Sequence, residues 1–222
     1  INPYPILPVH FTIASCEHRP QDGAPLEMVD LLNMTPSLCA FYNGASAGAS
    51  APDHLHFQAV LRSELPLLRA VEERHALGDA AARTSDSLGN FPMRFVSLVI
   101  KPDFSGMQML AVLPRLGGIS DDPATKRGLV NVLMWKDNSG LLRALLFPRR
   151  RHRPDCYFAE GEEKMLVSPG ALDMAGIIVT PREEDFERIS ADDIRLIYGQ
   201  VGISAADMEE YCRQADIAPF FK

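Results

Sequence analysis

Two spacings of apolar residues recur along the chain, and each predicts a different secondary structure. Between residues 26 and 35, the apolar positions 26, 28, 29, 31, 32 and 34 follow the spacing of an amphipathic helix. Pro36 predicts the end of this helix, because a proline disfavours helical backbone in the residue before it. We expect further helices over residues 63–75 and 105–116, and two near the C-terminus that begin with the Ser-x-x-Asp patterns at Ser190 and Ser204.

Short apolar runs and alternating residues predict strands elsewhere. The runs 129–135 and 141–147 flank a turn-forming sequence, Lys-Asp-Asn-Ser-Gly, so we expect them to form an antiparallel hairpin. Residues 1–9 carry three prolines and are expected to be extended, and the small, polar stretch 78–90 is expected to be a mobile loop. The other expected strands cover residues 10–14, 38–42, 54–61, 92–100 and 172–180.

An internal similarity predicts two related halves. Residues 10–20 align without gaps to residues 144–154, and Ser50 has a counterpart in Ser168. Each half would then be one strand–helix–hairpin unit. We therefore expect an α+β fold, in which antiparallel strands from two related halves form an extended sheet with flanking helices. The expected division is residues 1–100, residues 101–189 and, as C-terminal helices, residues 190–222.

Composition narrows the class of protein. The 222 residues are 46% hydrophobic and 23% charged, which is ordinary for a globular chain that buries a substantial core. A net charge of −7 argues against broad nucleic-acid binding but leaves room for a local basic pocket. The four cysteines are far apart, which favours reduced thiols and a cytoplasmic location. We expect no membrane span and no signal peptide.

Residues 42–58 combine a loop of small residues with an unusual pattern of polar side chains. The stretch ends in His-x-His-x-Gln, and alternate residues of a strand point to the same face. Two imidazoles and a carboxamide would therefore line one face of the strand. The glycines and serines before them, including Gly48 and Ser50, allow backbone amides to approach a ligand closely, as phosphate-binding loops do.

This arrangement suits chemistry at phosphorus. A neutral imidazole is a good nucleophile, so we expect His56 to attack the α-phosphorus of a nucleotide anhydride and to hold the nucleotidyl group. His54 would shape the pocket and orient its neighbour. Gln58 would donate an amide hydrogen bond to a phosphoryl oxygen but cannot act as an acid, which favours a stable covalent intermediate that awaits an acceptor.

A metal site is the alternative interpretation of the same histidines. A His-x-His pair on a strand binds metal ions in some β-barrels. The glutamine and the glycine-serine loop favour phosphorus chemistry instead, so we expect no metal and no cofactor. Cys16-Glu17-His18 also holds ligand-type residues, but the sequence offers no matching partner for them. Measuring the metal content of the purified protein would separate the two interpretations.

The motif resembles that of the histidine-triad (HIT) superfamily, in its transferase branch, where the pattern ends in glutamine. The likeness is greatest to GDP-L-galactose phosphorylases and related bacterial adenylyltransferase-like proteins. It extends in the same order over most of the chain. The similar segments are His10 with its following strand, Pro20-Gln21, Tyr42-Asn43, 54–59, 90–94, 131–148 and 174–187.

The resemblance implies a HIT-like fold and a nucleotidyltransferase of the phosphorylase type. It implies that His56 is the nucleophile, that Gln58 steadies the nucleotidyl intermediate, and that Asn43 and Ser50 surround the α-phosphate. The favoured donor is a nucleotide sugar such as a GDP-hexose, and the acceptor is phosphate or a sugar phosphate. Two alternatives remain open: a diadenosine polyphosphate phosphorylase or ATP adenylyltransferase, and a nucleotide-binding protein without turnover.

Three further residues are candidates for contacts with the substrate. His10 lies in the first expected strand, where a histidine can also be a satisfied core residue. Arg94 lies just inside another expected strand. Arg149 begins the basic run 149–153, which is either a solvated loop or a site for a terminal phosphate or a sugar phosphate. The sequence departs from the family at Val9, where a glycine is usual.

Overall fold

The computed structural model describes residues 1–74, 82–84, 88, 91–214 and 217. Most of the stretch 78–90, predicted to be a mobile loop, lies outside the described residues. Within them, no helix combines the length and apolar character needed to cross a lipid bilayer.

Strands of the described residues form one seven-stranded sheet in the order β1-β3-β2-β6-β7-β5-β4, and every neighbouring pair is antiparallel. The predicted hairpin is confirmed as the pair β6–β7. Its turn is held by Asp137, whose carboxylate accepts hydrogen bonds from the backbone of Ser139 and Leu141 and pairs with Arg143 at 2.7 Å. The strands are β1 (His10–Ala14), β2 (Leu38–Asn43), β3 (His56–Leu61), β4 (Ala82–Thr84), β5 (Val96–Ile100), β6 (Val130–Lys136) and β7 (Leu142–Pro148).

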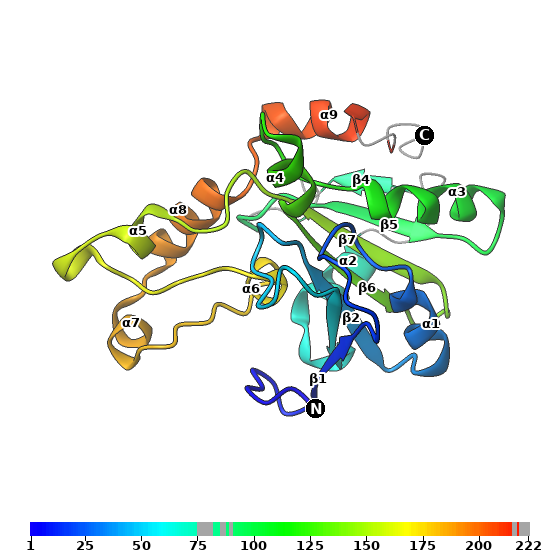
Figure 1. Ribbon diagram of the computed structural model, residues 1–222, viewed down its shortest axis with the longest axis horizontal. Coiled ribbons are helices and arrows are strands. Elements are labelled where there is room, and N and C mark those ends of the chain that lie inside the picture. The colour runs from blue at the N-terminus through cyan, green and yellow to red at the C-terminus, as the bar shows by residue number, and fades with distance from the viewer. Residues whose placement is uncertain (75–81, 85–87, 89–90, 215–216, 218–222) are drawn as a thin grey trace.

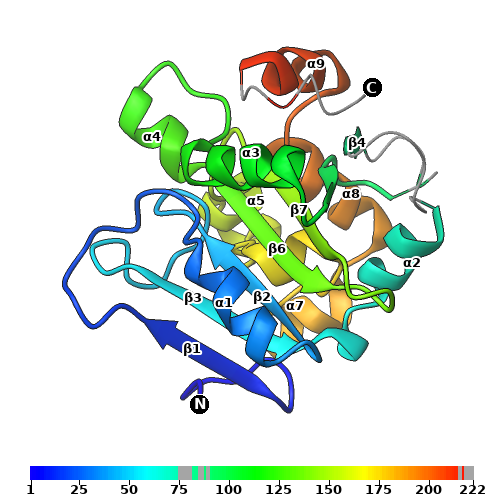
Figure 2. The same ribbon diagram turned by 90° about the vertical axis from the view of Figure 1, so that its right-hand side faces the viewer.

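Helices cover both faces of the sheet (Figures 1 and 2). Side chains of α1, α3 and α9 pack with one face, and those of α2, α6 and α8 pack with the other. The helices are α1 (Glu27–Met34), α2 (Pro66–Arg74), α3 (Phe104–Val112), α4 (Pro123–Gly128), α5 (Asp155–Phe158), α6 (Ala171–Met174), α7 (Glu183–Arg188), α8 (Ala191–Val201) and α9 (Ala205–Gln214).

The order of elements contains two strand–helix–hairpin units that meet at the centre of the sheet. One is β1-α1-β2-β3 and the other is built from β5, α3, β6 and β7, with β2 and β6 paired between them. The α+β class with an antiparallel sheet and flanking helices is confirmed. The gapless alignment of 10–20 with 144–154 is wrong as a structural match, because it pairs an outer strand, β1, with an inner one, β7. The division at residues 100 and 189 stays a prediction.

One predicted strand is absent. Residues 172–180 begin with the last three residues of α6 and continue without strand pairing. The buried carboxylate of Asp173 explains this, because it accepts hydrogen bonds from the backbone of Gly170 and Val179 and so curls the segment around itself. Gly176, at φ +98°, completes the turn.

The predicted helices are confirmed with small changes of boundary, and the strand expected from residue 92 begins only at Val96. Both C-terminal helices start as the Ser-x-x-Asp patterns predicted. At α8, the Ser190 hydroxyl accepts from the Asp193 amide at 3.2 Å, and the Asp193 carboxylate accepts from the Ser190 amide at 2.9 Å. Ser204 and Asp207 repeat this exchange at α9.

Candidate active site

His56 is the first residue of β3, and its buried imidazole is in contact at both ring nitrogens. Its Nδ1 lies 2.9 Å from the carbonyl oxygen of His54. Because a carbonyl only accepts, Nδ1 carries the proton and Nε2 keeps its lone pair. Nε2 lies 3.4 Å from the Ser50 hydroxyl, at the end of the glycine-serine loop. This tautomer is the one that a nucleophilic histidine needs.

The backbone of His56 is fixed by Gln21, a residue of the segment between β1 and α1. The Gln21 carboxamide nitrogen donates to the carbonyl oxygens of Asn43 at 2.7 Å and His56 at 2.8 Å. Its oxygen accepts from the His56 amide at 2.8 Å. Gln21 is only 2% exposed, so these three bonds clamp the end of β2 to the start of β3.

Gln58 lies on the same face of β3 as His56, two residues further along. Its carbonyl oxygen lies 2.7 Å from His10 Nε2 and accepts from the Asn2 side chain at 3.1 Å. His10 Nδ1 accepts from the amide of Ile6, so His10 Nε2 carries the proton and donates to Gln58. The oxygen of Gln58 is thereby engaged, and its NH₂ group has no partner among the described residues.

His10 is therefore a buried, neutral histidine that orients Gln58. Burial lowers the pKa of His10 below its ordinary 6.5, and the hydrogen bond to Gln58 opposes that shift. His10 is thus neither a core residue without a polar partner nor a side chain that is free to bind a ligand. Its donor nitrogen is used on Gln58, so a direct contact between His10 and a substrate stays a prediction.

His54 does not share the strand face with His56 and Gln58, which corrects the prediction. β3 starts only at His56, and the His54 amide donates to Ala51 in the turn that closes the loop. The His54 ring turns outward: its Nε2 donates to the Ser15 carbonyl at 2.8 Å, and its Nδ1 lies 3.1 Å from Nδ1 of His18. Since His54 Nδ1 then has the lone pair, His18 donates to it.

No group of three or more His, Cys, Asp or Glu side chains among the described residues is arranged to hold a metal ion. The pair of His18 and His54 lies near the site but lacks a third ligand of that kind.

The glycine-serine loop leaves β2 and folds against the start of β6. The amides of Gly44 and Ser46 donate to the carbonyls of Val130 and Gly128. Gly48, at φ +100°, lies against the segment 168–171: a Cβ atom there would be 3.1 Å from the Gly170 Cα and 3.2 Å from the Pro169 carbonyl oxygen. A side chain at this position would be crowded by that backbone, and L-residues rarely adopt its backbone conformation.

Further along the loop, backbone donors remain unused. In the described part of the chain, the amides of Gly48, Ser50 and Ala51 have no protein acceptor. They belong to the segment whose Ser50 hydroxyl meets His56 Nε2. Unpaired amides beside a nucleophile are suited to an anionic group such as a phosphate.

Asn43 links the loop to the second half of the sheet. Its side-chain oxygen accepts from Asn131 at 2.8 Å and from the amide of Ala171 at 2.7 Å. Asn131 in turn accepts from Arg149 at 2.7 Å. The oxygen of Asn43 is thus used to hold the site together, and only its NH₂ group could meet an α-phosphate.

Arg149 is fully buried, which the sequence did not reveal. Its Nε and Nη atoms donate five hydrogen bonds, one for each N–H of the guanidinium group. Burial lowers its pKa to about 10, although Asp173 opposes the shift. No donor is left for a substrate, so the predicted contact is replaced by a positioning role. The five acceptors are Asn131 and the backbone carbonyls of Pro169, Arg151, His152 and Val201.

Arg94 is not brought beside the motif. It precedes β5, and β2, β6 and β7 lie between β5 and β3, the strand of His56. Four strand spacings amount to roughly 19 Å, so a contact between Arg94 and a group held at His56 would need a long substrate. Its substrate role stays a prediction.

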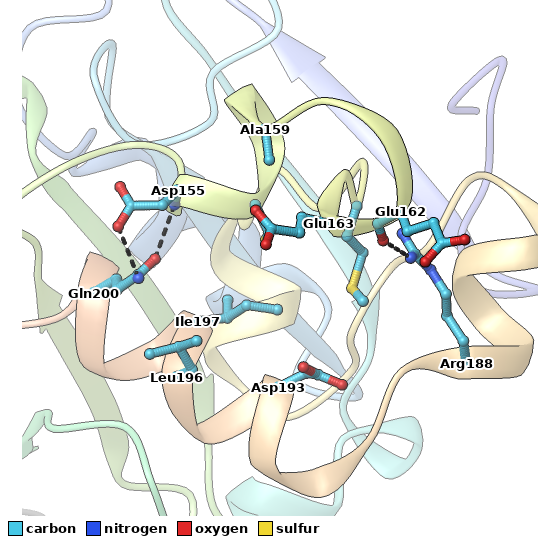
Figure 3. Close-up of a pocket in the computed structure, with 11 residues that line it drawn as sticks. Asp155, Ala159, Glu162, Glu163, Arg188, Asp193, Leu196, Ile197 and Gln200 are labelled. Carbon is cyan, nitrogen blue, oxygen red and sulfur yellow. Dashed lines mark hydrogen bonds between the residues drawn. The ribbon is translucent and has the colours of Figure 1, made fainter.

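A cavity of about 500 Å³ lies elsewhere, between α5, α8 and the turn at 161–163 (Figure 3). It is lined by Ile197 and Leu196, by the carboxylates of Glu162, Glu163 and Asp193, and by Arg188, which pairs with Asp185. The carboxylates outnumber this arginine, so the charge of the cavity opposes a polyphosphate, and no residue of the motif takes part. We therefore place the candidate active site at His56 and not in this cavity.

Comparisons with known proteins bear on the fold. A family model described as a domain of unknown function (DUF4922) matches residues 1–61, which contain the motif. The structure is similar to the crystal structure of yeast Ap4A phosphorylase Apa2, with a TM-score of 0.62, 19% identity, and coverage of 92% of this chain and 72% of that chain. For the same yeast enzyme in complex with AMP, the TM-score is 0.67 and the identity 16%, over 92% and 73% of the two chains. Comparison of the sequence with curated proteins found no match.

The fold is therefore the HIT-like α+β fold, as the motif predicted. The particular likeness to GDP-L-galactose phosphorylases is not supported by these structures. The similar enzyme is a diadenosine tetraphosphate phosphorylase, which corresponds to one of the two alternatives named from the sequence.

Proposed function

We propose that the protein is a nucleotidyltransferase of the phosphorylase type, which transfers a nucleotidyl group through a covalent intermediate on His56. The observation that carries the proposal is the state of this imidazole: Nδ1–H is fixed on the His54 carbonyl, and Nε2 turns its lone pair to the Ser50 hydroxyl, 3.4 Å away. The unpaired amides of the loop and the free NH₂ group of Gln58 support it, because they supply hydrogen-bond donors beside that nitrogen.

In the first half-reaction, His56 Nε2 attacks the α-phosphorus of the donor. The N–P bond forms as the bond between the phosphorus and its bridging oxygen breaks, and the leaving group departs with that oxygen. Positive charge then develops on the imidazole, and the His54 carbonyl stabilises it through Nδ1–H. Gln58 and the loop amides donate to the non-bridging oxygens, where negative charge is greatest.

In the second half-reaction, an oxygen of inorganic phosphate attacks the same phosphorus and the N–P bond breaks. The electron pair returns to Nε2, which restores the neutral ring. Gln58 has no acidic proton with which to assist water, so the intermediate persists until the acceptor arrives. This ping-pong order fits a phosphorylase better than a hydrolase.

For the donor, we favour a dinucleoside polyphosphate such as diadenosine tetraphosphate over a nucleotide sugar. The similarity to yeast Ap4A phosphorylase Apa2 supports this choice, and nothing in the comparisons supports a GDP-hexose. Nucleotide sugars remain the competing donors in the test.

The test is product analysis after incubation with diadenosine tetraphosphate, GDP-hexose or UDP-hexose, each with inorganic phosphate. We expect ADP and ATP from the first donor, and a His56→Ala variant that folds but has no turnover. Arg195→Ala is the control, because this exposed residue on α8 pairs with Asp192 and with no other carboxylate in the described part of the chain. Turnover by His56→Ala at the wild-type rate would refute the mechanism. Binding of nucleotide without any product would favour the non-catalytic alternative.

A further inference from the structure

Among the described residues, the basic run after β7 contains one arginine that has neither an ion pair nor a full set of hydrogen-bond acceptors. Arg149 is buried with all five donors used, as described above. Arg150 pairs with Asp207 at 2.9 Å. Arg151 pairs with Asp155, a carboxylate that Gln200 also holds at 2.9 Å (Figure 3). The remaining arginine of the run is Arg153.

Arg153 is held in place without a carboxylate. Its Nε donates to the Ser168 hydroxyl at 2.9 Å, and its guanidinium carbon lies 4.2 Å from the centre of the Tyr157 ring. Among the described residues it makes no ion pair, and its two Nη groups have no acceptor. A positioned guanidinium group with free paired donors is suited to bind a phosphate in a bidentate manner.

Ser168 and His152 form a small cluster with Arg153. His152 Nε2 lies 3.2 Å from the Ser168 hydroxyl. Burial, and after it the charges of Arg153 and Arg149, lower the pKa of His152 to about 4, so the ring is neutral at pH 7. Ser168 can therefore accept from Arg153 and donate to His152, which fixes its hydroxyl while its side chain stays exposed.

This cluster lies beside the glycine-serine loop of the candidate active site. Ser168 is followed directly by Pro169 and Gly170, the two residues whose backbone faces Gly48. Two residues of chain span at most about 7 Å, so Ser168 is that close to the loop contact at Gly170. The amide of Ala171 then donates to Asn43 at 2.7 Å. A phosphate at Arg153 would be a near neighbour of a phosphate at the loop.

We propose that Arg153, which Ser168 and His152 hold in position, forms a second phosphate subsite, which binds a phosphate group distal to the one that His56 attacks. The inference rests on the proposed function, because the phosphate group assigned to this subsite belongs to that same reaction. The bound group is either part of the donor's polyphosphate chain or the inorganic phosphate acceptor. Both offer phosphate oxygens to Arg153. Measuring the two half-reactions separately distinguishes the polyphosphate chain from the inorganic phosphate.

The first experiment measures the two half-reactions in the wild type, Arg153→Ala and Arg151→Ala. Nucleotidylation is followed with diadenosine tetraphosphate in the absence of phosphate, and discharge is followed by adding inorganic phosphate to the isolated nucleotidyl protein. Arg151→Ala is the matched control. It removes the same charge only two residues from Arg153, but from an arginine that is already paired with Asp155.

For Arg153→Ala we expect the half-saturating concentration to rise about tenfold or more in one half-reaction, the loss typical of a charge-assisted hydrogen bond. A rise for the donor assigns the subsite to the polyphosphate chain, and a rise for phosphate assigns it to the acceptor. The control should stay within about twofold, as expected for an exposed ion pair. An equal loss in both variants, or no loss in Arg153→Ala, would overturn the subsite.

A second experiment does not depend on turnover. Calorimetric binding of inorganic tripolyphosphate should be retained in His56→Ala and weakened about tenfold or more in Arg153→Ala. Equal binding by these two variants would overturn the subsite. If binding depends on Arg153 but no donor nucleotidylates the wild type, the proposed function fails and the phosphate subsite stands.

Discussion

Gln21 offers the sharpest test of how the site is held together. The side chain is 2% exposed and makes three hydrogen bonds of 2.7, 2.8 and 2.8 Å to the backbone of Asn43 and His56. Replacing it with alanine removes all three bonds and leaves two carbonyls and one amide without this partner. The residues it joins lie at the end of β2 and at the start of β3.

The size of the effect follows from these contacts. A net contribution of about 1 kcal/mol for each bond gives a loss of about 3 kcal/mol in the free energy of unfolding. Unsatisfied buried groups would increase the loss further. For a chain of this length, about 3 kcal/mol corresponds to a fall in Tm of roughly 6–12 °C. Because His56 loses its backbone anchor, the rate of nucleotidylation should fall more than the donor affinity does.

Urea unfolding and thermal unfolding of Gln21→Ala measure the stability, and rapid quench with diadenosine tetraphosphate measures the rate. Gln200→Ala is the matched control. It removes the two hydrogen bonds between the Gln200 side chain and the exposed Asp155, which lie away from the motif. We expect the control to lose less than about 1 kcal/mol. A loss below about 1 kcal/mol in Gln21→Ala, with an unchanged rate, would refute the clamp.

Three further predictions follow from the same network. Gly48→Ala should destabilise the protein by about 1–2 kcal/mol in urea unfolding, because its φ is +100°; an unchanged midpoint would contradict the close approach described for the loop. Arg149→Lys should lower the free energy of unfolding by about 2–4 kcal/mol in urea, because lysine offers three donors to five acceptors. An unchanged free energy of unfolding would show that the guanidinium network is dispensable. In an NMR titration, His152 should have a pKa of about 4 that rises in Arg153→Ala, since a positive charge that disfavours the imidazolium is removed. No rise would mean that the two side chains do not interact.

The pH dependence of stability should carry the signature of His10. Its pKa in the folded protein is lowered, so the unfolded chain takes up the proton at a higher pH than the folded chain does. The contribution of His10 to the free energy of unfolding is therefore fully present above about pH 6.5, its ordinary pKa, and is lost as the pH falls below that value. The free energy of unfolding of His10→Gln should depend less on pH between 7.5 and 5 than that of the wild type. Equal slopes would contradict the assignment.

Local patterns predicted most of the sheet and its helices. The helix at 27–34, the hairpin β6–β7 and the capped helix α8 each follow from apolar spacing or from a turn or cap sequence within a few residues. Such signals act along the chain, so one sequence is sufficient to find them. The strand predicted at 172–180 failed because a buried aspartate binds two backbone amides there, and nothing in the apolar pattern indicates that.

At the site, the motif placed His56 and Gln58 on one face of a strand, as they lie in β3, but it did not show what positions them. The clamp by Gln21 joins residues 35 positions apart in the chain, and the bond between His10 and Gln58 spans 48. Arg149 looks in sequence like the other arginines of the run, although it directly follows the apolar strand β7. His54 was placed on the wrong face because the loop turn ends at His54 and pairing starts only at His56. Each of these depends on contacts between distant segments.

The most direct test of the account is mass spectrometry of the protein after incubation with diadenosine tetraphosphate in the absence of phosphate. We predict a mass increase of one adenylyl group, located by peptide mapping on His56 and removed when inorganic phosphate is added. The Arg195→Ala control should gain the same mass, and His56→Ala should gain none. An adduct on another residue, or an adduct that persists in His56→Ala, would contradict the central role assigned to this imidazole.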